Sequence, residues 1–403
     1  MNTQRHASGQ KNLALQLILL LGVVSAFGDI TYEGARSVSG PYLAFLGAGA
    51  SVVGLVSGLG EFLGYALRLL AGYIADRTRA YWWVTFVGYG LLISIPLLAL
   101  ANRWELAALL LILERVGKAV RSPARDTILS HATQQTGRGW GFALHEALDQ
   151  VGAIIGPLVF SAVFLLGGSY RQGFSLLWIS VFLTLGALFV ARMRVPSPER
   201  LEAPSMEKPQ ALPGTRGLPR VFWLYALFTF LSVAGFANFQ IISYHLVTRK
   251  IVPAAQIPVF YAVAMGVDAL MALVIGKAYD KVGLVALLLI PVATIPIPFL
   301  AFSSSYALAW AAVILWGIAM AVHETIMRAA IADITPLARR GTAYGIFNTA
   351  YGASWFVGST LMGMLYERAG IYLALFVVLA EVLSLPVFLL VRKEIRLANP
   401  ARP

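Results

Sequence analysis

The sequence contains no cysteine, so it can form neither a disulfide bond nor a thiolate metal site or nucleophile. It also contains no Asn-x-Ser/Thr sequon, so nothing suggests a glycosylated surface protein of a eukaryote. Charged residues make up only 12% of the 403 residues, about half of their usual share in globular proteins. These absences favour a prokaryotic protein that is not a water-soluble globular one.

The sequence is instead rich in apolar residues. They make up 59% of the sequence, and the mean hydropathy is +0.75. A helix that crosses a bilayer needs about 20 apolar residues, so the length allows about twelve crossings with short loops. We therefore predict an all-α membrane protein with twelve helices, near 13–38, 46–76, 81–101, 104–132, 139–166, 173–193, 220–246, 254–281, 283–303, 306–334, 340–366 and 371–392.

One long polar segment divides the chain. Residues 194–219 are rich in proline, glutamate and lysine, which is typical of a solvated linker. This predicts an N-terminal six-helix bundle over 1–193 and a C-terminal six-helix bundle over 220–403. The start of the chain, with Arg5 and Lys11 before an apolar run, also resembles a cleaved export signal. The eleven similar segments that follow favour a first transmembrane helix instead.

The net charge of +12 first suggests a nucleic-acid partner, but the placement of the basic residues indicates membrane topology. With the N-terminus inside, nineteen Lys and Arg residues fall in cytoplasmic segments and five fall outside. By the positive-inside rule, both termini are cytoplasmic. We expect a prokaryotic inner-membrane protein that binds no nucleic acid. The five outer residues are Arg103, Arg171, Arg249, Lys250 and Arg368.

An internal repeat relates the two halves. The segment Gly-Tyr-Ile-Ala-Asp-Arg at 72–77 ends the second helix, and Gly-Lys-Ala-Tyr-Asp-Lys at 276–281 ends the eighth, at an offset of 204 residues. The same offset relates Gly137 to Gly341 and Gly141 to Gly345. Two blocks with one offset indicate duplicated halves, a transporter plan with the substrate site near mid-membrane.

The Gly-x-x-x-Asp-Arg/Lys loops resemble the signature loop of the major facilitator superfamily, and the resemblance covers the whole chain. The first copy departs from the family pattern at Arg79, where glycine is usual, and the second at Leu284. The resemblance implies alternating access, with these loops locking one state. We expect the glycines to allow close helix approach and the acids to face a helix N-terminus. The alternative is a loop that only marks the cytoplasmic side. The gating candidates are Gly72, Asp76, Arg77, Gly276, Asp280 and Lys281.

Charged residues within the predicted helices recur at helical spacing. They gather in helices one, two, four, five, eight and ten, whereas helices three and nine have none in their cores. A charge that faces lipid is costly, so these side chains are expected to face a cavity or one another. The alternative is that the acid–base pairs only neutralise each other. The stripes comprise Asp29, Glu33 and Arg36; Glu61 and Arg68; and Glu114, Arg115, Lys118, Arg121 and Arg125.

Helix five carries His145, Glu146 and Asp149, followed by Gly-x-x-x-Gly-Pro at 152–157. Gly152, Gly156 and Pro157 resemble the antiporter motif of the superfamily's drug exporters, although the trailing Gly-Gly is absent. A carboxyl group withdrawn from water favours its neutral form, which is what proton coupling needs. We predict Asp149 with Glu146 as proton-coupling groups, followed by Glu61 and Asp29. The rival is a static salt bridge from Asp149 to Lys118 or Arg115.

The sequence thus predicts a secondary transporter, a proton-coupled antiporter that exports small, partly apolar compounds. Neither a phosphate loop nor a Gly-x-Ser-x-Gly or His-Glu-x-x-His motif occurs, so we predict no enzyme, no metal and no cofactor beyond an ion gradient. The partners are a small-molecule substrate and lipid, and the chain is a monomer. The alternatives are an importer or exchanger of an organic anion, and a lipid translocase or non-transporting sensor. Substrate-binding candidates are Glu33, Arg36, Arg68, Arg115, Lys118, Arg121, Asn238, Gln240, Tyr244, Trp316, His323, Glu324, Asn348, Tyr351 and Trp355.

The predicted topology can be checked by labelling. Single cysteines in the 194–219 loop and at Gly168 should react with an impermeant maleimide from opposite sides of the membrane. The background is clean because the chain has no cysteine of its own. Labelling of both positions from the same side would contradict twelve crossings with cytoplasmic termini.

Overall fold

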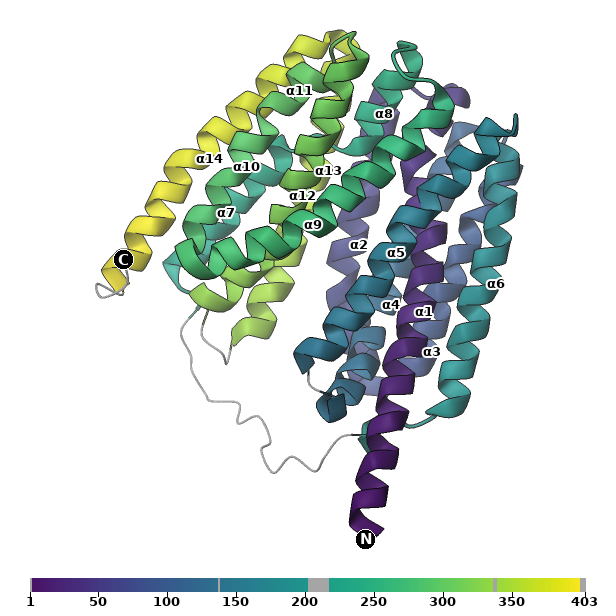
Figure 1. The fold of residues 1–403 in the computed structure, drawn as a ribbon. Helices are drawn as coiled ribbons and strands as arrows, with labels where there is room; N and C mark the ends of the chain where they lie inside the picture. Colours follow the sequence, from purple (N-terminus) through teal and green to yellow (C-terminus); the bar gives the residue numbers. More distant parts are fainter. Residues whose placement is uncertain (1, 137, 202–216, 336–338, 399–403) are drawn as a thin grey trace. The chain divides into compact units, whose positions relative to one another are not determined.

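A computed structural model of the chain describes residues 2–136, 138–201, 217–335 and 339–398, and within these ranges every regular element is a helix (Figure 1). The first half contains α1 (Asn2–Phe45), α2 (Ala50–Thr78), α3 (Tyr81–Gly90), η1 (Leu91–Ser94), η2 (Pro96–Leu100), α4 (Trp104–Thr136), α5 (Arg138–Leu165), α6 (Tyr170–Arg194) and η3 (Pro198–Leu201). The second half contains α7 (Arg220–Gly235), α8 (Phe239–Thr248), η4 (Ala254–Gln256), α9 (Ile257–Val282), η5 (Gly283–Leu288), α10 (Leu289–Thr294), α11 (Pro296–Ala301), α12 (Tyr306–Ile334), α13 (Arg340–Arg368) and α14 (Gly370–Ala398).

These elements group into the predicted crossings once consecutive short helices are joined. Nine described segments are long and apolar enough to span a membrane, and one of them, 254–301, has 48 residues, enough for two crossings. The remaining long helices, α4 and α13, have lengths of 33 and 29 residues. The all-α membrane fold predicted from the sequence is therefore confirmed.

Three predicted helices are interrupted rather than continuous. The third is divided near Pro96, and the ninth is divided among η5, α10 and α11 around Pro291, Pro296 and Pro298. Proline removes a backbone donor and clashes with the preceding turn, which explains these breaks. The seventh helix is divided at residues 236–238, where no proline occurs.

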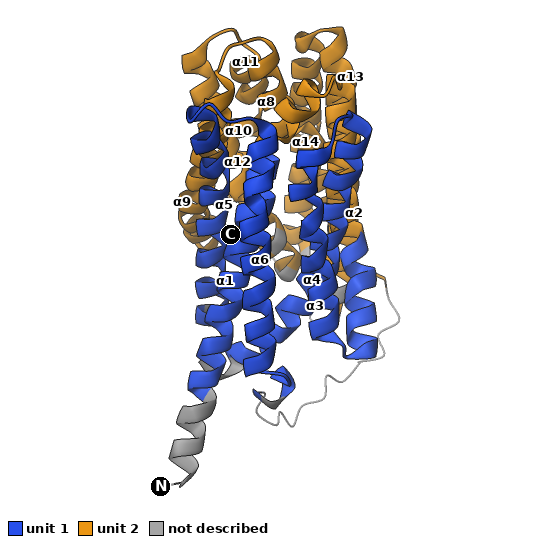
Figure 2. Cartoon of the chain, turned by 90° about the vertical axis from the view of Figure 1, so that its right-hand side faces the viewer, with its two compact units in different colours: residues 1–36, 67–210 blue, residues 37–66, 211–403 orange. Residues whose placement is uncertain are grey.

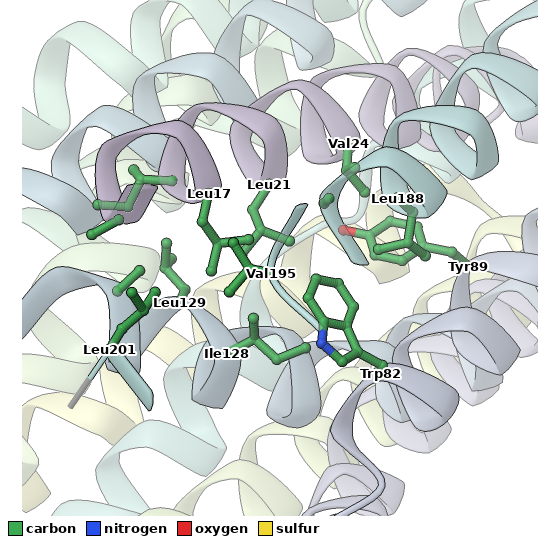
Figure 3. Close-up of a cluster of buried hydrophobic side chains, with 14 of the residues drawn as sticks. Leu17, Leu21, Val24, Trp82, Tyr89, Ile128, Leu129, Leu188, Val195 and Leu201 are labelled. Carbon is green, nitrogen blue, oxygen red and sulfur yellow. The ribbon is translucent and has the colours of Figure 1, made fainter. Parts of the chain in front are cut away.

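The chain forms two compact units, coloured separately in Figure 2. Unit 1 comprises residues 1–36 and 67–210. Its apolar core, drawn in Figure 3, is built by α1, α3, α4 and α6, and Val195 and Leu201 complete it. Leu201 is only 3% exposed, so it packs on this cluster although it lies in the predicted linker, whereas Pro196 and Glu199 are exposed. Residues 202–216 of the linker lie outside the described residues.

Unit 2 comprises residues 37–66 and 211–403. It therefore includes the end of α1 and the first half of α2, which pack on C-terminal helices through small residues. Gly40 lies against the Gln240 carbonyl, and Gly54 lies against that of Ser359. The compact units thus cross the sequence halves, and the boundaries at 193 and 220 stay a prediction.

Within unit 1, two glycines bring α5 into backbone contact with α1. Gly152 lies against the Ala26 carbonyl, and a methyl group added at Gly156 would lie 2.5 Å from the Ile30 carbonyl oxygen. Small residues allow helix backbones to approach closely in membranes. This contact places the polar residues of α5 beside those of α1.

We predict that Gly156→Ala destabilises the protein by about 1–3 kcal/mol, the usual cost of overpacking. The added methyl group meets rigid backbone, so α1 and α5 must separate. The measurement is thermal unfolding in detergent. The matched control is Gly186→Ala in α6, where no atom lies within 4 Å, and which should unfold at the same temperature as wild type or higher. Equal unfolding temperatures for Gly156→Ala and wild type would contradict the packing.

Candidate functional site

Unit 1 contains a cluster of polar side chains supplied by α1, α3, α4 and α5. Helix α1 contributes Ser25, Asp29, Tyr32, Glu33 and Arg36, which lie three, four or seven residues apart and therefore share a face. Glu33 and Arg36 are buried, and Asp29 is half-buried. Several turns of α1 thus place charge inside the unit rather than on its outer surface.

Tyr32 is at the centre of the basic residues. Its ring lies 4.3 Å from the Arg115 guanidinium carbon and 4.0 Å from Lys118 Nζ, distances at which cation–π attraction acts. Its hydroxyl oxygen accepts a hydrogen bond of 2.9 Å from Arg36. One aromatic side chain therefore joins three of the predicted substrate-binding cations.

Carboxylates complete the pairing of these cations. Glu114, which is fully buried, accepts a hydrogen bond of 3.1 Å from Arg121 and lies 3.9 Å from Arg115 Nε. Glu33 lies 3.7 Å from Arg36. Pairing is required because an uncompensated buried charge is strongly destabilising.

A second group of bonds surrounds Ser25. Its hydroxyl lies 2.9 Å from Arg125, 3.3 Å from the Tyr89 hydroxyl and 3.2 Å from His145 Nε2. Arg125 also donates to Asp126 at 2.8 Å. Four helices are thereby tied together by one serine.

Asp29 and Asp149 differ from the other acids of the cluster. Asp29 interacts electrostatically with Asp149, Glu33, Lys118 and Arg121. Among the described residues, neither Asp29 nor Asp149 forms an ion pair, and Asp149 Oδ1 is buried without a hydrogen-bond partner. His145 Nδ1, one turn before Asp149 on α5, is likewise buried and unbonded. Asp149 Oδ1 and His145 Nδ1 thus mark a place that can accept a proton or a ligand group, although Asp149 interacts electrostatically with Arg125 and His145 Nε2 lies 3.2 Å from Ser25.

The other predicted proton-coupling residues lie elsewhere. Glu146 is exposed on α5, whereas Glu61 is buried in unit 2. Arg68 is half-buried in unit 1. The proton-coupling roles of Glu146 and Glu61 and the substrate-binding role of Arg68 stay predictions.

In unit 2 the break between α7 and α8 is stabilised by two side chains. Asn238 caps α8, its carbonyl oxygen accepting from the Ile241 amide at 2.8 Å. The Trp316 indole donates to the Ala237 carbonyl at 2.9 Å. Non-helical backbone at membrane depth requires such partners, since lipid supplies none.

Aromatic rings surround this break. Phe236 stacks on Trp316, with centroids 5.5 Å apart, and on His323, at 4.8 Å. Trp355 meets the same ring edge-on at 5.6 Å, and Tyr351 of α13 packs 4.9 Å from Tyr65. Three predicted substrate-binding aromatics, Trp316, Tyr351 and Trp355, are therefore buried in one aromatic core. Both ring nitrogens of His323 are buried without a hydrogen bond.

The remaining predicted binding residues of unit 2 are dispersed. Gln240 is buried at the start of α8, and Tyr244 is half-buried near its end. Glu324 and Asn348 are half-buried on α12 and α13. No group of three or more potential metal ligands occurs among the described residues.

The repeated loops do not show the close packing expected from the sequence. A methyl group at Gly72 would lie 3.5 Å from Pro123, and one at Gly276 would lie 3.9 Å from Thr325, both ordinary contacts. Asp76 accepts a hydrogen bond of 3.3 Å from Tyr81, and Arg77 donates to Tyr73. Asp280 and Lys281 are exposed, and Pro157 is buried within α5. The gating role of these loops stays a prediction.

Sequence reasoning missed Tyr32, Ser25, Tyr89 and Phe236. Tyr32 could have been found, because it lies three residues after Asp29 and four before Arg36 on a charged face. Ser25, Tyr89 and Phe236 carry no such signal, since small polar and aromatic residues are common on every helix of this chain.

We predict that Glu114→Gln lowers stability by about 3–5 kcal/mol, because it leaves Arg121 without its buried partner. Thermal unfolding in detergent measures the loss, and Glu114→Gln combined with Arg121→Gln should recover part of it. As the control, Arg220→Gln removes a pair with Glu394 in which the Arg220 side chain is 78% exposed, and should cost about 0–1 kcal/mol. Equal effects of the two single variants would contradict the assigned pairing.

Comparison with known proteins agrees with the all-α membrane fold. An uncharacterized protein of Mycobacterium tuberculosis is 41% identical over 382 residues, covering 94% of this chain and 93% of that protein. An uncharacterized MFS-type transporter of Methanocaldococcus jannaschii is 28% identical over 91% of this chain and 92% of its own length. A crystal structure of a mutant of the nucleoside transporter NupG has the same fold, with a TM-score of 0.74 at 16% identity over 94% of this chain and 99% of that chain. The family model described as Major Facilitator Superfamily matches residues 18–359, and the chain belongs to this superfamily of membrane transporters.

Proposed function

We propose that the protein is a proton-coupled antiporter that exports small, partly apolar compounds, with Asp149 as the main proton-coupling group. One observation carries the proposal: Asp149 Oδ1 is buried without a hydrogen-bond partner, within a cluster whose cations are paired. A proton would satisfy this oxygen, and loss of that proton would leave a charge whose electrostatic partner, Arg125, already donates to Asp126.

The distribution of partners in unit 1 favours a proton over an anion as the coupled species. Arg36, Arg115, Arg121 and Arg125 each face an acid of the chain itself, and Lys118 faces the Tyr32 ring. Asp29 and Asp149 are the acids left without an ion pair. Two neighbouring carboxylates can hold one proton between them, which removes their mutual repulsion.

Close helix packing supplies a way to couple that proton to movement. Gly152 and Gly156 hold the α5 backbone against α1 on the face that carries Asp149. Separating these two backbones would admit water beside Asp149, so that proton exchange there and movement of α5 against α1 would depend on each other.

The substrate side of the proposal is based on unit 2. Discontinuous helices form binding sites in many transporters. The α7–α8 break is such a place, and Trp316, His323 and Trp355 surround it. Stacked rings suit flat, partly apolar compounds.

The second candidate, transport of an organic anion by the basic residues of α2 and α4, is less well supported. It needs cations that are available to a ligand, whereas those of α4 already have partners. The nucleoside transporter among the structural neighbours nevertheless makes nucleosides a reasonable class to test.

We predict that proteoliposomes with an imposed proton gradient will move an aromatic cation such as ethidium against its own gradient. Uridine and benzoate serve as the nucleoside and anion probes. Asp149→Asn should abolish gradient-driven transport, yet leave gradient-free exchange of the same compound, because binding does not require the proton. Tracer flux measures both activities.

The matched control is Glu381→Gln. Glu381 is also a buried acid with one unbonded oxygen, Oε1, but Ser232 donates to its Oε2, and it lies between α7 and α14 of unit 2, outside the charged cluster of unit 1, so its loss should leave coupling intact. Benzoate flux that ignores the proton gradient would favour the anion transporter. Concentrative transport by a normally expressed Asp149→Asn protein would show that Asp149 is not the coupling group. A parallel fall in expression and both activities would indicate a structural salt bridge.

A further inference from the structure

One end of unit 2 contains a pocket that the proposed transport site does not use. Its volume is about 560 Å³, within the range of small-molecule sites. It lies where α8 ends, where α11 is followed by α12, and where α13 meets α14. By the positive-inside rule, this end is the non-cytoplasmic one.

The pocket gathers positive charge that the topology does not require. Arg249, Lys250 and Arg368 line it, and they are three of the five basic residues predicted on the outer side. Outer loops carry few basic residues in proteins of this kind. Their convergence on one pocket therefore indicates a local role.

Lys250 occupies a position that favours glycine. Its φ is 57°, in the left-handed region that few residues other than glycine adopt. It follows the end of α8, where the Ile251 amide donates to the Leu246 carbonyl in the manner of a glycine-terminated helix. Lysine at this position adopts an unfavourable backbone conformation and places a positive charge beside the pocket.

The apolar part of the pocket is formed by three rings. His245 is 7% exposed, its Nδ1 lies 2.7 Å from the Tyr366 hydroxyl, and it also interacts with the Ser303 backbone. Phe302 and Tyr366 meet the imidazole edge-on at 5.1 and 5.6 Å. These contacts fix the three rings as one wall against which an aromatic group can pack.

The one acid on the pocket wall is engaged elsewhere. Glu367 accepts hydrogen bonds from the Ser51 amide at 2.9 Å and the Ser51 hydroxyl at 2.8 Å, at the start of α2. Its charge is directed to that helix N-terminus, where an anion is favoured. The pocket keeps a net positive charge, because three cations line it against this single acid.

We propose that this pocket binds a small organic anion with a carboxylate or phosphate head and an aromatic body. Arg249, Lys250 and Arg368 hold the head, and His245, Phe302 and Tyr366 contact the ring. The site is separate from the α7–α8 break and from the Asp149 cluster, so the inference does not depend on proton coupling. An anion free in solution and the phosphate of an anionic lipid share this chemistry.

The test is a titration of the full-length protein in phosphatidylcholine nanodiscs with phenyl phosphate, followed by calorimetry. Wild type should bind saturably, and high salt should weaken binding because the charges are exposed. Arg249→Gln combined with Arg368→Gln should weaken binding at least about tenfold, through loss of two charge-assisted contacts. Arg103→Gln combined with Arg171→Gln removes outer cations away from the pocket and should leave the affinity unchanged.

A second variant separates binding from folding. Lys250→Gly relieves the left-handed backbone, so its unfolding temperature should equal or exceed that of wild type, while its affinity for phenyl phosphate falls several-fold. Phosphatidylglycerol nanodiscs identify the source. Competition that depends on Arg249 and Arg368 indicates a lipid phosphate, and unchanged affinity indicates a free anion. No saturable binding by wild type, or equal affinity in the Arg249/Arg368 variant, would overturn the proposal.

Discussion

A charge buried in a bilayer must have a partner, because lipid cannot solvate it. This requirement organises unit 1. Glu114 is matched to Arg121 and Arg115, Glu33 is matched to Arg36, and Lys118 lies over the Tyr32 ring and interacts electrostatically with Asp29. Against this background the unbonded oxygen of Asp149 stands out. The proposed coupling role follows from that contrast, since a group whose partner is missing is the one whose charge can change.

The same requirement applies to the backbone. Where α7 gives way to α8, the freed groups are taken up by Asn238 and Trp316, so the break costs little and the surrounding rings remain packed. Where α5 meets α1, no side chain intervenes, and Gly152 and Gly156 bring main chain against main chain. The capped α7–α8 break and the α1–α5 glycine contact both restrict where nearby polar side chains can lie. A proton or a ligand group is therefore the simplest partner for an unbonded atom such as Asp149 Oδ1.

The charged stripes were predictable from the sequence because helical spacing alone decides which residues share a face. The all-α membrane fold was predictable for the same reason, since hydropathy reports which segments enter lipid. Which charged residues pair with each other was not predictable from the sequence. Glu114 pairs with Arg121, seven residues away on the same helix, whereas Arg125 donates to Ser25 on another helix. The break at 236–238 was missed because it contains no proline, whereas those near Pro96 and Pro296 could have been expected. The repeated loops at Gly72 and Gly276 resemble a family motif, but a motif does not state which contacts one conformation makes.

The contacts of residues 37–66 in unit 2 suit a transport cycle in which they must be made and broken. Gly40, Gly54 and Gly363 bring the end of α1 and the start of α2 against backbone of the C-terminal helices, and Ser51 donates to Glu367 at the start of α2. Such contacts depend on fit and on a few hydrogen bonds, since the hydrophobic effect does not drive helices together in lipid. If this end of the unit opens, water can replace the Ser51–Glu367 hydrogen bonds. Separating helices that meet at small residues also breaks fewer van der Waals contacts than separating helices that meet at leucines. The core of unit 1, built from Leu17, Leu21, Leu129 and Leu188, is of the opposite kind. A proton at Asp149 would therefore act at the glycine contact between α5 and α1, whereas this leucine core would stay packed.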